Sequence, residues 1–343
     1  MIKKNKFPSE LRFDIVSKHW VVIATGRVRR PKTFKQEKHI KEKKSSKDCV
    51  FCDISKQEKP LTVFHNGKKV KPTKNGSAPK NWSVVSVPNK YPAFIKNRAL
   101  NKRAEGPHQL MDATGFHEVV ITKNHNKQIA QFSIKQIKEV IDVYQERYLA
   151  LMNEKFVNYI SIFHNHGKEA GASVAHPHSQ IIAIPVIDPD IQANIIGSRA
   201  FFNTHKKCIF CEMNKWDIKN KKRVVFENKE FIAVCPFASK VAFEVSISPK
   251  NHNAYFERIN ENQKLALAQA LQAVTRKLYK GLNNPAYNFF LRTAPCDNKN
   301  YDFFHWRLNI MPKTSIWAGF ELGAGIEIST IEPEKAAEYL RKQ

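Results

Sequence analysis

The sequence predicts an α+β fold built from two similar halves, and three features of the chain support this. A Cys-x-x-Cys pair occurs twice, at Cys49 and Cys52 and again at Cys208 and Cys211. Each pair is followed by runs in which apolar residues alternate with others, the pattern of half-buried antiparallel strands. Each half then has one stretch with the apolar spacing of a helix. Antiparallel strands plus one helix, present twice, predict an α+β class with internal duplication.

The elements of the first half are expected in a simple order. Strand-like runs occupy 82–87 and 118–125, and the second run ends in a turn and a histidine. The stretch 132–152 has apolar residues at i, i+3 and i+4 spacing, which predicts a helix. An extended run at 159–185 closes this half and contains His176.

The second half repeats this order of strands, helix and closing extended run. Its elements are expected at 231–236, 244–252, 265–282 and 287–312. We expect the boundary between the halves near 188–200, around Ile187-Asp188-Pro189-Asp190. The chain is therefore divided into an N-terminal half, residues 1–190, and a C-terminal half, residues 191–343, each a histidine-containing α+β unit.

Length and composition describe an ordinary globular protein. The chain has 343 residues, of which 42% are hydrophobic and 26% charged, and domains average about 150 residues. No apolar run approaches the ~18 residues of a membrane helix, and residues 1–6 contain no apolar signal core. We therefore expect a cytoplasmic protein that makes no membrane contact.

The charge is strongly positive, because 57 Lys and Arg face 31 Asp and Glu, a net of +26. One interpretation is nucleic-acid binding, since basic proteins attract phosphate backbones. The other is a lysine-rich surface over a basic active site. We favour the second, because the lysines are spread along the chain and the densest stretch, 32–47, lacks the aromatic residues that stack on bases. No nucleic-acid partner is expected, and the charge fits anionic substrates.

Four of the six cysteines have metal-ligand spacing. A Cys-x-x-Cys pair plus two histidines completes a tetrahedral zinc site, and the same pair also occurs in redox motifs. Two sites are predicted, formed by Cys49, Cys52, His125 and His176, and by Cys208, Cys211, His252 and His305. We expect structural zinc ions that position the chemistry rather than perform it. Cys235 and Cys296 have no partner at this spacing.

The run His176-Pro177-His178-Ser179-Gln180 is the candidate catalytic segment. Alternate side chains of an extended segment share a face, so the two histidines and the glutamine project together. A neutral imidazole at His178 can attack phosphorus, and the Gln180 amide can hold a phosphoryl oxygen as charge develops. The preceding loop, which contains Ser173, can bring backbone N–H groups to a phosphate. The alternative is three polar residues on the exposed face of a half-buried strand.

With these residues in place, the sequence resembles the galactose-1-phosphate uridylyltransferase family of the histidine-triad superfamily, over nearly its whole length. The segments that carry the resemblance are Glu10–Asp14 with Trp20–Ile23, Gly26–Pro31, Cys49-x-x-Cys52, Pro88–Pro92, the His-Pro-His-Ser-Gln run with its upstream Asn and Ser, and Trp317–Gly323. The resemblance implies two histidine-triad-like halves, a homodimer and ping-pong transfer.

The resemblance also implies roles for particular residues. His178 is the expected nucleophile that takes a nucleoside monophosphate from a nucleotide sugar, and Gln180 contacts the transferred phosphoryl group. Because hydrolases of the superfamily usually have His at that position, Gln180 favours transfer over hydrolysis. The further substrate contacts that the resemblance implies are Arg27 and Arg30 at the phosphates, partly across the dimer, Asn89 at the nucleoside, Asn165, Gly171 and Ser173 in the phosphate loop, and Phe320 and Glu321 at the sugar phosphate.

At several positions this chain differs from the best-known members of that family. Some of those members build the second metal site from one Glu and three His and hold iron there, so this chain's second site, although zinc-like, could take iron. Some members have Asn-Asp where this chain has Asn89-Lys90, which affects recognition of base and ribose. Arg307 stands near the position that corresponds to His178. The second half is therefore expected to keep its metal and to lack a nucleophile.

The activity expected first is conversion of UDP-glucose and galactose 1-phosphate into glucose 1-phosphate and UDP-galactose. The tail 323–329 also resembles a branch that uses ADP-glucose and inorganic phosphate. The alternatives are accordingly an ADP-glucose phosphorylase or adenylyltransferase and a dinucleoside polyphosphate phosphorylase. A zinc-containing nucleic-acid-binding protein is the alternative from another class, and it leaves the His-Pro-His-Ser-Gln run unexplained.

Overall fold

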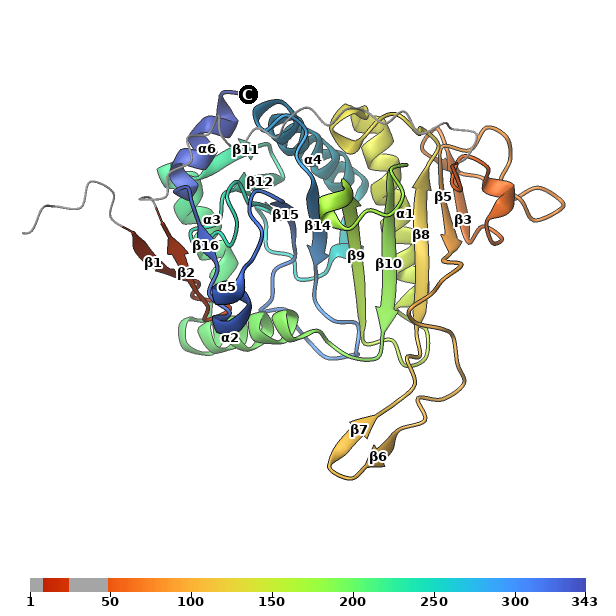
Figure 1. The fold of residues 1–343 in the computed structure, drawn as a ribbon, viewed down its shortest axis with the longest axis horizontal. Coiled ribbons are helices and arrows are strands. Elements are labelled where there is room, and N and C mark those ends of the chain that lie inside the picture. Colours follow the sequence, from red (N-terminus) through yellow and green to blue (C-terminus); the bar gives the residue numbers. More distant parts are fainter. Residues whose placement is uncertain (1–8, 25–48) are drawn as a thin grey trace, which may run out of the picture.

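The structure is a computed structural model that describes residues 9–24 and 49–343, and a single large antiparallel sheet runs through it (Figure 1). The sheet has 11 strands. Their order across the sheet is β11 (Val224–Glu227), β12 (Phe231–Val234), β13 (Val245–Pro249), β15 (Arg307–Pro312), β14 (Tyr287–Arg292), β9 (Tyr159–His166), β10 (His178–Ile184), β8 (Phe116–Thr122), β5 (Val84–Pro88), β3 (Thr62–His65) and β4 (Lys68–Lys69).

The strands follow a similar order outward on the two sides of a central seam. On one side of the seam lie β9, β10, β8, β5 and β3, and on the other β14, β15, β13, β12 and β11. The seam is the antiparallel pair β9 and β14, in which Asn165 lies opposite Asn288. The α+β class is confirmed, and the strands of the two expected halves occupy opposite sides of one sheet. Internal duplication stays a prediction that this order supports.

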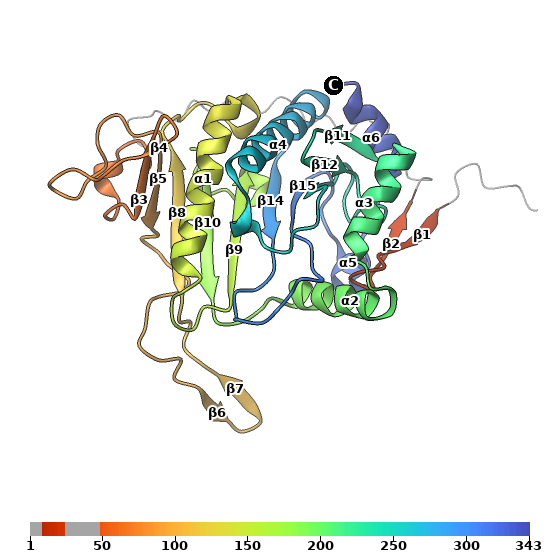
Figure 2. The same ribbon diagram turned by 180° about the vertical axis from the view of Figure 1, so that it is seen from behind.

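One long helix from each half packs on the same face of the sheet, as seen from behind in Figure 2. These helices are α1 (Ile134–Leu151) and α4 (Glu261–Gly281). Each begins with a capping box, Ser133 with Gln136 and Asn260 with Gln263, which satisfies the first backbone N–H groups of the helix. Their apolar sides join the strands in one continuous core that spans both halves, so both predicted helices are confirmed.

Four further helices in the described part of the chain were not expected from the sequence. Helix α2 (Pro189–His205) begins where the boundary between the halves was placed, and α3 (Ile209–Asn220) follows the second Cys-x-x-Cys pair. The segment is helical because Asp188 accepts a hydrogen bond from the Ile191 N–H at 2.9 Å and proline occupies the first turn. The region expected to hold the boundary between the halves is therefore helical. The chain ends in α5 (Gly319–Ala324) and α6 (Pro333–Arg341).

Smaller elements decorate the main sheet. The strand β1 (Glu10–Phe13) pairs with β2 (Trp20–Ile23), which in turn pairs with β16 (Ile328–Ser329) and so brings the start of the chain to the second half. The hairpin of β6 (Arg103–Glu105) and β7 (His108–Leu110) projects from the body of the molecule (Figure 1). Short 3₁₀ turns lie at Ile54–Lys56, Ile129–Gln131, Lys168–Ala170 and Phe256–Arg258.

Two parts of the sequence analysis fall outside the described residues. These are the pair of arginines, Arg27 and Arg30, and the lysine-rich stretch 32–47. Within the described ranges, no helix combines the length and the apolar character needed to cross a membrane.

Candidate active site and metal centres

The first predicted metal cluster is assembled around the end of β8. Cys52 Sγ lies 3.1 Å from His125 Nδ1, and His176 Nδ1 lies 3.5 Å from the Sγ atoms of Cys49 and Cys52. The Nε2–H of His176 donates to the carbonyl oxygen of Thr122 at 2.5 Å. A backbone carbonyl can only accept, so this bond leaves the Nδ1 lone pair of His176 directed into the cluster.

The second cluster repeats this construction at the end of β13. His252 and His305 each place Nδ1 3.5 Å from Cys211 Sγ, and His305 Nδ1 lies 3.8 Å from Cys208 Sγ. Their Nε2–H groups donate to backbone carbonyls, that of His252 to Asp302 and that of His305 to Pro249. Both histidines therefore direct Nδ1 into the cluster, as His176 does in the first cluster.

The donor sets fit a tetrahedral metal ion. In each cluster two thiol sulfurs and two imidazole nitrogens lie within 4.8 Å of one another, and Cys₂His₂ is a common set for structural zinc. Burial lowers the pKa of His176 to about 4, which keeps its ring neutral, as ligation requires. A hydrogen bond from Cys211 lowers the pKa of Cys208, which favours the thiolate form that metals bind.

His178 lies at the start of β10, two residues after the metal-cluster histidine. Its side chain is 8% exposed, and its Nδ1–H donates to the His176 carbonyl oxygen at 2.8 Å. Burial lowers the pKa of His178, so the neutral ring has a free lone pair on Nε2. Phe51, from within the first Cys-x-x-Cys loop, packs against the ring with centroids 4.9 Å apart. Residues of the first metal cluster and its loop therefore hold the ring of the nucleophile candidate in place.

Gln180 follows on the same face of β10, and a histidine orients its amide. His117 on β8 accepts from the Ala93 N–H at Nδ1, so its other ring nitrogen carries the proton. That Nε2–H donates to Gln180 Oε1 at 2.7 Å. Asn89, at the end of β5, has its Nδ2 3.1 Å from the same ring nitrogen. With its oxygen occupied, Gln180 presents its NH₂ group to a ligand.

A second amide is oriented across the seam of the sheet. Asn288 on β14 donates from Nδ2 both to Asn165 Oδ1 and to the Ala170 carbonyl, each at 2.8 Å. The Asn165 amide nitrogen lies closest to the position that a side chain at Gly171 would occupy, 3.9 Å away. Gly171 has φ +83°, which favours glycine. Ser173 lies exposed in the same loop.

The C-terminal tail lies apart from this group of residues. Phe320 is 52% exposed on α5, and Glu321 accepts from the Ala318 N–H at 3.1 Å, which closes the first turn of that helix. Figure 1 shows α5 beside the second-half strands rather than beside β10. Within one chain, the structure therefore brings together His178, Gln180, Asn89, Asn165 and Gly171, and not the tail residues.

The sequence analysis missed the partners of the two amides. His117 directly precedes the predicted run 118–125, and extending that run by one residue would have placed it on the same face as Val119 and Ile121. Asn288 had no local signal, since its role depends on the pairing of β14 with β9. Phe51 was part of a recognised repeat, but its contact with His178 depends on the folded metal loop.

Comparison with known proteins finds similar enzymes and a matching family. Residues 2–187 match the family described as galactose-1-phosphate uridyl transferase, N-terminal domain. ADP-glucose phosphorylase of Arabidopsis thaliana is 31% identical over 99% of this chain and 94% of that protein. Galactose-1-phosphate uridylyltransferase of Thermotoga maritima is 29% identical over 97% of this chain and 98% of that protein. The crystal structure of the Arabidopsis ADP-glucose phosphorylase with bound ADP-glucose superposes with a TM-score of 0.80 and 29% identity, covering 98% and 99% of the two chains.

The fold and the site define a nucleotidyltransferase with a histidine nucleophile candidate and two Cys₂His₂ clusters. The chain belongs to the galactose-1-phosphate uridyl transferase family, because the matched segment covers more than half of it and full-length relatives share about 30% of its residues.

Proposed function

We propose that the protein transfers a nucleoside monophosphate from a nucleotide sugar to a phosphate acceptor through a nucleotidyl intermediate on His178. The observation that carries this proposal is the hydrogen bond from His178 Nδ1–H to the His176 carbonyl. It fixes the tautomer, so that the Nε2 lone pair is free beside the presented amide of Gln180. A positioned neutral imidazole next to a donor for a phosphoryl oxygen is the arrangement that covalent phosphoryl transfer needs.

The reaction balances in two steps. In the first, the Nε2 lone pair of His178 attacks the α-phosphorus of the donor, a P–N bond forms, and the P–O bond to the sugar phosphate breaks. The sugar 1-phosphate leaves as an anion. In the second step, an acceptor phosphate oxygen attacks the same phosphorus and the P–N bond breaks, which returns the imidazole. The amide hydrogens of Gln180 and Asn165 stabilise the phosphoryl oxygens in both steps.

We propose zinc as the ion at both clusters, held by Cys49, Cys52, His125 and His176 in the first half and by Cys208, Cys211, His252 and His305 in the second. When bound, the ion supplies structural cross-linking rather than a reacting group. In the first half the bound ligand His176 fixes the start of β10, and thereby the direction of the His178 ring. Iron at the second cluster is the alternative, and metal analysis distinguishes it.

Two donor and acceptor pairs are proposed for this site. UDP-glucose with galactose 1-phosphate is supported by the Thermotoga relative and by the family description. ADP-glucose with inorganic phosphate is supported by the Arabidopsis relative and by the structure of that enzyme with bound ADP-glucose. The resemblance of the tail at 323–329 to the branch that uses ADP-glucose also favours the second pair.

We propose that the remaining predicted contacts complete the site in a cytoplasmic homodimer. Arg27 and Arg30 would reach the phosphates, and Phe320 and Glu321 the sugar phosphate, partly from the partner chain. The exposure of Phe320 and of the neighbouring Leu322, at 52% and 71%, supports a covered position in an assembly. Sedimentation analysis should give a dimer, and a monomer at assay concentrations would remove this part of the proposal.

The test of the transfer reaction is intact-protein mass spectrometry with each donor and no acceptor. The proposal predicts a gain of one nucleoside monophosphate that disappears in His178→Gly. Addition of acceptor should then discharge the adduct and release the new nucleotide product. An active wild-type enzyme that carries no adduct and inverts configuration at phosphorus would point to direct transfer without a covalent step.

A further inference from the structure

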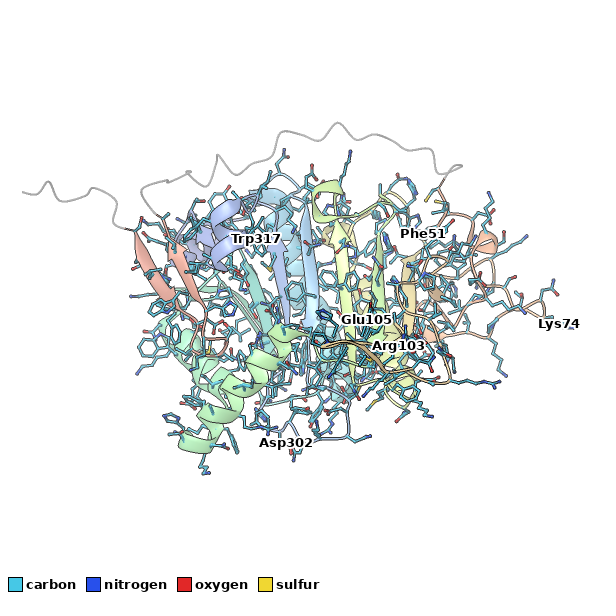
Figure 3. The ribbon with its side chains drawn as sticks, turned by 60° about the horizontal axis from the view of Figure 1, so that its bottom comes forward. Phe51, Lys74, Arg103, Glu105, Asp302 and Trp317 are labelled. Atoms are coloured by element: carbon cyan, nitrogen blue, oxygen red, sulfur yellow. The ribbon has the colours of Figure 1, made fainter. Side chains whose placement is uncertain are left out.

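A cavity lined by both polar and apolar side chains lies in the second half, on the sheet face that corresponds to the face of His178 and Gln180. Its volume is about 430 Å³, and its walls come from β13, β14 and β15, helices α2 and α3, and the turn after β1. Trp317, which lines this cavity, and Phe51, which packs on His178, lie over different halves of the sheet in Figure 3. The cavity is therefore distinct from the proposed active site.

The sheet register relates the cavity to the active site residue by residue. Gln180 lies opposite Val119 in the first half, and Asn309 lies opposite Ser246 in the second. Counting two residues back along each strand places Arg307 where the first half has His178. The metal loops agree, because Phe210 lies under the Arg307 guanidinium, 4.4 Å from its Cζ, as Phe51 lies against the His178 ring.

The sheet face behind the cavity carries buried polar side chains where the first half has mostly apolar ones. The positions of Val119 and Ile121, which pack in an apolar cluster, correspond to Ser246 and Ser248, which are 8% and 6% exposed. Glu244, which corresponds to His117, is 5% exposed. Ser248 donates to Asn214 Oδ1 at 3.1 Å, and Glu244 accepts from the Lys240 N–H at 2.7 Å, so these two groups have partners within the protein. A polar surface of this kind around a cavity favours polar contents.

Arg307 has hydrogen-bonding capacity that the described part of the protein does not use. Its Nη2 donates to Asn194 Oδ1 at 2.8 Å, whereas its buried Nη1 has no partner among the described residues. Asn309 Oδ1, also buried, lacks a donor there as well. By contrast, Asp190 and Asp217 in the same walls each pair with another arginine, Arg292 and Arg223, at 2.8 and 2.7 Å.

An unpartnered guanidinium N–H group next to an unpartnered amide oxygen indicates a ligand that can both accept and donate hydrogen bonds. The planar fork of arginine matches the oxygens of a phosphate group, and a hydroxyl group can donate to Asn309 Oδ1. A volume of about 430 Å³ lies within the usual range for small-molecule sites, and leaves room for a sugar or nucleoside beside the phosphate.

We propose that this cavity is a second, non-catalytic site that binds a small phosphomonoester bearing hydroxyl groups. Its phosphate pairs with Arg307, and one of its hydroxyls donates to Asn309. A sugar phosphate and a nucleoside monophosphate share this chemistry. The site uses none of the residues assigned to transfer, so its occupancy does not depend on the proposed reaction.

The test is the stoichiometry of binding, measured by titration calorimetry with glucose 1-phosphate, AMP and inorganic phosphate on the full chain. Arg307→Met should lose one glucose 1-phosphate or AMP site per chain relative to the wild type, or weaken it at least about tenfold, since charge-assisted hydrogen bonds contribute about 1.5–3 kcal/mol. The matched control is Arg199→Met, whose guanidinium lies over the Phe303 ring in the same half, outside the cavity walls. It should keep the wild-type stoichiometry.

Two further readouts keep the proposal testable if the variant is poorly folded. Crystals of the wild type soaked in arsenate should show anomalous density beside Arg307, and glucose 1-phosphate should raise the melting temperature of Arg199→Met more than that of Arg307→Met. Equal stoichiometry in wild type and Arg307→Met, with no arsenate at Arg307, would overturn the proposal. Inorganic phosphate that binds there as tightly as the two esters would overturn the assigned role of the hydroxyl groups.

Discussion

The two halves of the sheet are built on one plan, yet they differ at the positions where chemistry is expected. Each has a Cys₂His₂ cluster at the end of a strand, and the corresponding histidines His176 and His305 each donate Nε2–H to a backbone carbonyl. The first half then places His178 and Gln180 after its cluster, and the second places Arg307 and Asn309. The comparison shows that the two halves share the construction of their metal clusters and differ in the residues two and four positions later, which is where the proposed functions of the halves diverge.

The largest expected effect on the transfer rate distinguishes His178 from Arg307, the residue at the corresponding position of the second half. His178→Gly should lower transfer by about 10⁴-fold or more, because no other group supplies the attacking lone pair. Arg307→Met, at the corresponding position, should leave the transfer rate close to that of the wild type. Steady-state assays with both donor pairs measure this.

The control for the His178 variant is its metal content. His178→Gly should keep two zinc ions per chain, because its side chain belongs to neither cluster. A variant that lost one zinc ion with its activity would show that the roles of His176 and His178 are exchanged.

The metal ligands give the next comparison. His176→Ala and His305→Ala should each remove one metal ion per chain and lower the melting temperature, since a structural metal contributes to folding. Only His176→Ala should also abolish transfer, because His176 fixes the strand that carries His178. Elemental analysis and the transfer assay measure the two effects together. Equal loss of transfer in both variants would contradict the assignment of one active site per chain.

Substitution of the two corresponding amide residues, Gln180 and Asn309, should change kcat by factors that differ less. Gln180→Ala should lower kcat by about 10²–10³-fold, the usual effect of removing one donor to a developing oxyanion. Asn309→Ala should change kcat by less than about twofold, because it lies in the second half. An unchanged kcat in Gln180→Ala would remove this residue from the mechanism.

The smallest effect expected concerns the residue that orients Gln180. His117→Leu removes the donor to Gln180 Oε1, and we expect kcat to fall about tenfold with little change in KM, the cost of a misdirected donor rather than lost binding. His117→Gln, whose amide can still donate, should recover most of the rate. A rise in KM at constant kcat would instead assign His117 to nucleotide binding.

The sequence predicted local features of the fold and the site well. The two long helices follow from apolar spacing, and the metal clusters follow from cysteine and histidine spacing, because both depend on residues near in the chain or repeated in it. The shared face of His178 and Gln180 follows from strand alternation. The helix α2 had the Asp-Pro start of a helix, which was interpreted as a boundary instead.

What could not be predicted depends on long-range pairing. The contact of Asn288 with Asn165 requires that β14 pairs with β9 across the seam of the sheet. The predicted runs 118–125 and 244–252 begin at Glu118 and Glu244, which are one residue out of the correspondence that the strand register gives. The cavity beside Arg307 requires α2, α3 and the N-terminal turn to close over the second half.

The most direct test of the whole account is the mass of the intact protein after incubation with UDP-glucose, and separately with ADP-glucose, in the absence of acceptor. The account predicts a gain of one UMP or one AMP per chain in the wild type and in Arg307→Met, and no gain in His178→Gly. The donor that labels the protein identifies the base. Labelling that persists in His178→Gly, or that is lost in Arg307→Met, would contradict the assignment of the nucleophile to the first half.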